Sequence, residues 1–134
     1  MSTASQYAST VRFDGDTIST ANTARDGTGT IGTIFTAGSS GSRIDRITIK
    51  ATGTTTAGMV RLFIYDGAAY FLFREIAVSA IVPSGTTATF SSAMSSNNAQ
   101  DIGHLPLILP SGHSLRASTH NNESFNVLAY GGDF

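Results

Sequence analysis

The chain has 134 residues, a length that suits a single domain. Hydrophobic residues make up 40 %, enough for one core, whereas charged residues make up 13 %, about half the usual share. With a net charge of −1 and no cysteine, the composition argues against the clustered cations of a nucleic-acid-binding surface and excludes disulfides, thiolate metal sites and cysteine nucleophiles.

Serine and threonine take the place of charged residues, with 17 Ser and 18 Thr. Threonine packs well on a pleated sheet, and a charge-poor surface suits a protein that lies against another protein. The first residues are polar and lack the apolar segment of a signal peptide. No run approaches the ~18 apolar residues of a membrane-spanning helix. We therefore expect a soluble protein, synthesised in the cytoplasm, with no membrane partner.

Residues 1–42 are mostly small and polar, with apolar residues too sparse for a core of their own. Runs at 11–13 and 17–20 flank Asp14-Gly15, a pair typical of a hairpin turn. We interpret the segment as an extended N-terminal arm with short strands. Such an arm is ordered by packing on the main body or on a neighbouring subunit, and a disordered tail is the alternative.

Residues 43–134 are expected to form one β-domain. The run 42–51 predicts a strand, because Ile47 and Ile49 alternate with polar residues. Later runs of β-forming residues are separated by Gly, Pro and Asn turns. They predict strands at 59–65, 70–78, 86–92, 105–109, 115–119 and 125–130. About eight short strands at this spacing are typical of an all-β fold, an antiparallel β-sandwich or jelly roll.

The densest apolar stretch is Met59–Val78, which predicts two strands joined by a turn at Asp66-Gly67. Side chains alternate between faces along a strand, so any turn of even length fixes which residues share a face. One face is wholly apolar and is the predicted core face; it consists of Val60, Leu62, Ile64, Phe71 and Phe73. A β-bulge near Arg74-Glu75 would keep Glu75 out of the core and bring Ile76 into it.

The other face of this hairpin is rich in aromatic residues and arginine, a combination enriched at protein interfaces. It consists of Met59, Arg61, Phe63, Tyr65, Tyr70, Leu72 and Arg74. Two interpretations stay open: a docking surface, or an outer face covered by the N-terminal arm. The candidate interface residues are Tyr7, Val11, Phe13, Arg61, Phe63, Tyr65, Tyr70 and Arg74.

The sequence carries no catalytic signature, so we expect no enzyme, no cofactor and no metal. The match to G-x-G-x-x-G at Gly27–Gly32 lacks the strand before it and the helix after it that a dinucleotide site needs. The three histidines, His104, His113 and His120, do not have the spacing of a helical metal site.

Four runs together, at 47–49, 60–67, 70–78 and 107–117, resemble the small jelly-roll capsid decoration (cement) proteins of tailed bacteriophages. The shared pattern is a V-x-L-x-Y, turn, Y-x-L hairpin and a late L-x-L-P-x-G-x-S-L strand pair. The resemblance covers about residues 44–130. It implies a virion structural protein on the outer capsid surface that clamps neighbouring capsid subunits. The implied partners are the major capsid protein and further copies of the chain, as a homotrimer.

Two alternatives remain open at this point. The first is a tail or fibre structural module of the same fold. The second is a carbohydrate-binding jelly roll, for which Tyr65, Asp66 and Tyr70 at the hairpin turn would offer an aromatic platform beside a carboxylate.

Overall fold

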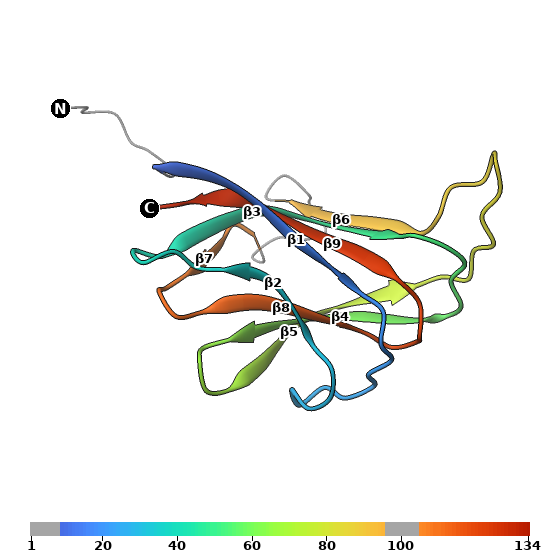
Figure 1. Ribbon diagram of the computed structural model, residues 1–134, viewed down its shortest axis with the longest axis horizontal. Coiled ribbons are helices and arrows are strands. Elements are labelled where there is room, and N and C mark those ends of the chain that lie inside the picture. The colour runs from blue at the N-terminus through green and yellow to red at the C-terminus, as the bar shows by residue number, and fades with distance from the viewer. Residues whose placement is uncertain (1–8, 96–104) are drawn as a thin grey trace.

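The protein is described by a computed structural model that covers residues 9–95 and 105–134 (Figure 1). These residues form nine strands, all paired antiparallel, in two sheets packed face to face. The predicted all-β sandwich is therefore confirmed. The described part of the chain contains no helix that is long and apolar enough to cross a membrane.

The first sheet lies in the upper part of Figure 1 and has the order β1-β9-β3-β6. Its strands are β1 (Thr10–Ile18), β9 (Phe125–Asp133), β3 (Ser42–Ala51) and β6 (Ser91–Ser95), and β7 (Leu107–Leu109) pairs with the beginning of β3. The second sheet lies below it, in the order β2-β8-β4-β5. Its strands are β2 (Gly32–Thr36), β8 (Ser114–Thr119), β4 (Gly58–Tyr65) and β5 (Tyr70–Val78).

The core lies between the two sheets and is built from the inward residues of each strand. In β3, Ile47 and Ile49 are buried while the residues between them are not, which confirms the predicted alternation. Ile44 is also buried, three positions before Ile47, because a bulge at Asp45 shifts the register with β9 between Ile44 and Arg46. Beside this bulge β9 carries Gly131, where a Cβ atom would lie 1.8 Å from the Arg43 carbonyl oxygen.

The predicted hairpin is confirmed as β4 and β5, joined by the four residues 66–69. Gly67 has a φ of 98°, and the Asp66 carboxylate accepts hydrogen bonds from the amides of Ala68 and Ala69. A bulge is present, slightly earlier than expected: Phe63 pairs with Leu72 and Leu62 with Arg74, so Phe73 is the extra residue.

This bulge restores the pattern of the hairpin as predicted. Glu75 lies opposite Arg61 on the outer face, and Ile76 lies opposite Val60 and packs against the core. Phe71 is different: it follows the parity of the core face but is 55 % exposed. Its strand partner Ile64 packs against the core, whereas Phe71 lies on the edge strand β5.

The predicted hairpin at Asp14-Gly15 is wrong. Residues Thr10–Ile18 form one continuous strand, each paired with a residue of β9. Gly15 serves close packing here, because a Cβ atom at this position would lie 2.4 Å from the Leu128 side chain. The described part of the predicted N-terminal arm thus supplies one edge strand of each sheet, β1 in the first and β2 in the second.

The strand predicted at 86–92 is also wrong in its position. The backbones of Ser84 and Thr87 bond each other in both directions, and the Ser84 hydroxyl accepts from the Thr86 and Thr87 amides. These bonds extend the turn, so β6 begins only at Ser91, opposite Lys50.

Candidate interaction surfaces

The aromatic and arginine face of the β4–β5 hairpin is not open to solvent at its centre. Phe63 is fully buried and Arg61 is 2 % exposed. The prediction that these two residues form a docking surface is therefore wrong for the structure of the chain. The fold agrees with the alternative interpretation, in which the N-terminal segment covers this face of the hairpin.

The cover is the segment 19–31 between β1 and β2, which we call the covering loop. It attaches to β8 through an isolated bridge between Ala21 and Thr119, with an Asn22 amide to Thr119 carbonyl bond of 2.8 Å. Gly27 packs so closely on Tyr70 that a Cβ atom would lie 2.5 Å from it. The Asn22 side chain holds the loop in shape by donating to the carbonyls of Thr28 and Thr30.

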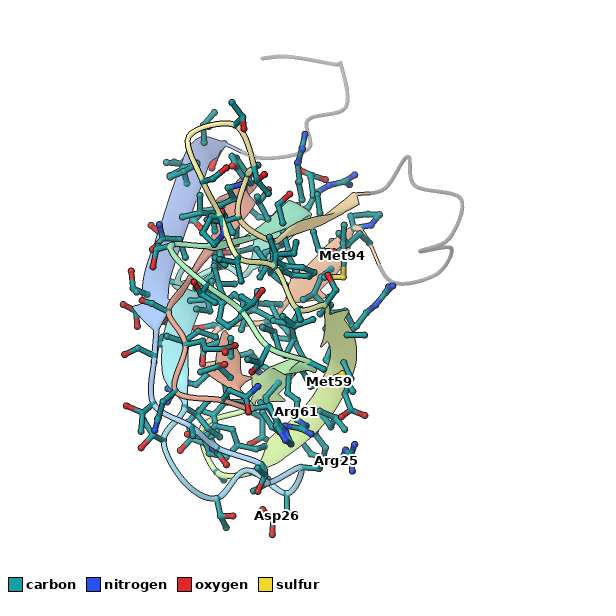
Figure 2. All side chains as sticks on the ribbon, turned by 90° about the vertical axis from the view of Figure 1, so that its right-hand side faces the viewer. Arg25, Asp26, Met59, Arg61 and Met94 are labelled. Carbon is teal, nitrogen blue, oxygen red and sulfur yellow. The ribbon has the colours of Figure 1, made fainter. Side chains whose placement is uncertain are left out.

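Beneath the covering loop, Arg61 is the centre of a polar network. Figure 2 shows Arg61 near Arg25 of the loop. The Nε atom of Arg61 lies 2.9 Å from the Glu75 carboxylate, and one terminal nitrogen contacts the Asn22 carbonyl at 3.4 Å and His120 Nδ1 at 3.3 Å. Glu75 also receives Arg25 from the loop at 2.7 Å. The hydrogen bond from Arg25, followed by that from Arg61, lowers the pKa of Glu75. A buried arginine needs such partners, so this network fastens the loop to the sheet.

Tyr65 and Tyr70 end the same face, with ring centroids 4.4 Å apart. The Arg116 guanidinium lies 4.4 Å from the Tyr65 centroid and donates to the Tyr70 hydroxyl at 3.2 Å. The Asp66 carboxylate accepts hydrogen bonds from the turn amides, chiefly that of Ala69, and these bonds lower the pKa of Asp66. A sugar-binding platform needs a free ring face and a free carboxylate, so these contacts weigh against one here. Arg74 is partly buried, opposite Leu62.

Three candidates come from the N-terminal segment. Tyr7 lies outside the described residues. Val11 is 90 % exposed and Phe13 is 58 % exposed, both on the outer face of β1. Phe13 packs edge-on against Tyr130 of β9, with centroids 4.6 Å apart. These two residues therefore remain available to a partner.

The inward face of β1 is fixed by Arg12. Its guanidinium stacks on the buried Phe35 ring at 4.1 Å and bonds the Asp133 carboxylate at 3.0 Å and the Asp14 carboxylate. Asp133 also accepts from the Ser42 hydroxyl, and this bond, before the arginine, lowers the pKa of Asp133. The cluster ties β1, β3 and β9 together at one end of the first sheet.

Two exposed apolar residues of the hairpin, Phe71 and Leu72, were not among the predicted interface residues. Phe71 is 55 % and Leu72 is 38 % exposed, on opposite faces of the open edge strand β5. Parity placed Phe71 in the core, because parity fixes the face on which a residue lies and not how far a residue of an edge strand is covered. The sequence did contain one signal: the run from Tyr70 to Phe73 is apolar on both faces, and a strand with one solvated face alternates instead.

Among the described residues, no group of three or more His, Cys, Asp or Glu side chains is placed to hold a metal ion. Comparison with protein families, with curated protein sequences and with solved structures finds no match.

Proposed function

We propose that the chain is a virion structural protein that binds the outside of a phage capsid and clamps neighbouring capsid subunits. Two lines of support meet in this proposal. The first is the resemblance of the hairpin and the late strand pair to capsid decoration proteins. The second is the strand order, in which the connections β1–β2, β2–β3, β3–β4, β5–β6, β7–β8 and β8–β9 cross between the sheets. Such an order supports a jelly roll.

The observation that carries the proposal is the apolar end of the hairpin. Phe71 and Leu72 are exposed on both faces of β5, which is the open edge of its sheet. An apolar edge strand is a ready template for pairing with another chain, and proteins usually protect such edges with charge or cover. An edge of this kind fits a protein whose work is adhesion, with the major capsid protein as its partner.

The first test is the composition of particles. Mass spectrometry of purified virions should find the chain in a fixed ratio to the major capsid protein. Its absence from particles would overturn the proposal, and a copy number limited to that of a tail would favour the tail or fibre alternative.

The second test locates the contact. Replacing Phe71 and Leu72 by serine should lower occupancy on capsids at least tenfold, because exposed aromatic and aliphatic anchors carry most of the energy of an interface. The matched control is Val82→Ser, which removes another exposed apolar side chain, 76 % exposed, away from the hairpin. Equal occupancy of the hairpin variant and the control would remove β5 from the proposed contact.

A further inference from the structure

The strand β1 is the open edge of the first sheet, with β9 as its neighbour. It is nine residues long, and its outer face carries the exposed Val11 and Phe13. In Figure 2 it lies along one margin of the molecule, as the blue ribbon. A long edge strand with exposed apolar side chains favours pairing with a strand of a second chain. The residues along β1 identify that chain.

We propose that β1 pairs with β1 of a second copy of this chain, antiparallel about a two-fold axis that passes at Phe13. A two-fold contact is self-complementary, because each residue meets its counterpart from the same patch. Inward residues then lie opposite inward residues, and outward residues opposite outward ones.

The inward charges select this register. With the axis at Phe13, Arg12 of each copy lies opposite Asp14 of the other, so both cross-strand pairs are of opposite charge. An axis at Arg12 would set two arginines side by side, and an axis at Asp14 would set two carboxylates side by side. Like charges opposite each other destabilise a strand pair. Inward charges guard an edge against general pairing, whereas the axis at Phe13 sets each arginine opposite a carboxylate and sets no like charges opposite each other.

The outward residues fit the same register. Val11 of one copy lies opposite Gly15 of the other, and Gly15 has no side chain to oppose it. A shallow, open depression lies beside Gly15; it is lined in part by Phe13 and by Leu128, whose side chain leans over Gly15. Val11 projects from the same strand and is 90 % exposed. Each copy thus presents a projecting valine and the depression that receives it, while the two Phe13 rings meet on the axis.

The self-association is tested on the full chain by native mass spectrometry and sedimentation. We expect a dimer mass at roughly 100 μM, since a single strand pair is a small interface. Phe13→Glu and Phe13→Lys each place like charges on the axis and should raise the dimer dissociation constant at least tenfold. An equimolar mixture of the two should restore the dimer as a mixed pair. The matched control Ile108→Lys changes a 53 % exposed apolar residue away from β1 and should leave the dimer intact.

A second experiment remains decisive if the charged variants fold poorly. The chain has no cysteine, so a single introduced thiol reports one position. Phe13→Cys should be cross-linked by a short bis-maleimide, because the two thiols meet on the axis. Thr17→Cys, on the same face of the same strand, should not, because its two copies would lie ~27 Å apart, eight residues along the strand.

Three results would overturn the proposal: a monomer at the highest concentration, a trimer mass, or a dimer that the Phe13 variants leave unchanged. The resemblance to decoration proteins implies a threefold contact instead, and the measured mass separates the two. This test uses the isolated protein and residues of β1. Its outcome is therefore distinct from that of the particle experiments on β5.

Discussion

Replacing Phe63 by alanine distinguishes a buried outer face from a docking surface. Phe63 lies on the face of the second sheet away from the core and is fully buried beneath the covering loop, with its ring 6.2 Å from that of Tyr70. Truncating a fully buried phenylalanine costs about 3–5 kcal/mol. In a domain of this length 1 kcal/mol shifts the melting temperature by roughly 3–5 °C, so Tm should fall by about 10–20 °C.

The matched control is Phe71→Ala in the same hairpin. It removes the same side chain from a position that is 55 % exposed, and its cost should stay below about 1 kcal/mol. Both variants are measured by thermal and urea unfolding followed by circular dichroism. A Tm for Phe63→Ala within about 3 °C of the unmodified protein would refute the assignment of this face to the interior and restore it as a docking surface.

Three further changes test the contacts that hold the fold. Gly131→Ala should cost more than about 3 kcal/mol, because its Cβ atom would lie 1.8 Å from a carbonyl oxygen of β3; Gly85→Ala, with nothing within 4 Å, should be neutral in the same urea titration. Glu75→Ala leaves the buried Arg61 without its carboxylate and should speed tryptic cleavage within the covering loop, a result that unchanged cleavage would contradict. Asp133→Asn tests acid stability. The pKa of Asp133 is lowered in the fold, so its contribution is complete above the ordinary carboxylate pKa of about 4 and is lost as pH falls through the folded value. The variant should therefore have a lower Tm at pH 7 and a shallower decline below pH 5.

Local patterns predicted most of the sandwich. The alternation in 42–51 and the apolar hairpin Met59–Val78 each reflect a period of two that the sheets enforce. Even the hairpin bulge could be expected, because Glu75 and Ile76 are out of phase with the residues before the turn. These features are local, so they can be inferred directly from the order of apolar and polar residues.

The burial of Phe63 and Arg61 could not be predicted in the same way. It depends on the covering loop, whose residues are polar and small and whose contacts reach residues 39 to 101 positions away in the chain. Asp14-Gly15 shows the same limit: glycine there serves close approach to Leu128, whereas the dipeptide alone indicates a turn. Long-range packing decided both cases, and composition predicts it poorly.

The N-terminal segment is therefore part of the fold. Residues Thr10–Ile18 pair with β9 along its whole length, Ile18 is buried, and Arg12 joins β1 to Asp133. Deleting residues 1–20 should cost on the order of 5 kcal/mol, comparable with the stability of an ordinary domain, and should leave the chain largely unfolded by circular dichroism. Deleting residues 1–8 is the matched control, since it leaves β1 intact from Thr10 onward. If the longer deletion kept a cooperative transition near that of the shorter one, β1 would be a detachable arm, and its pairing with β9 would contribute little to stability.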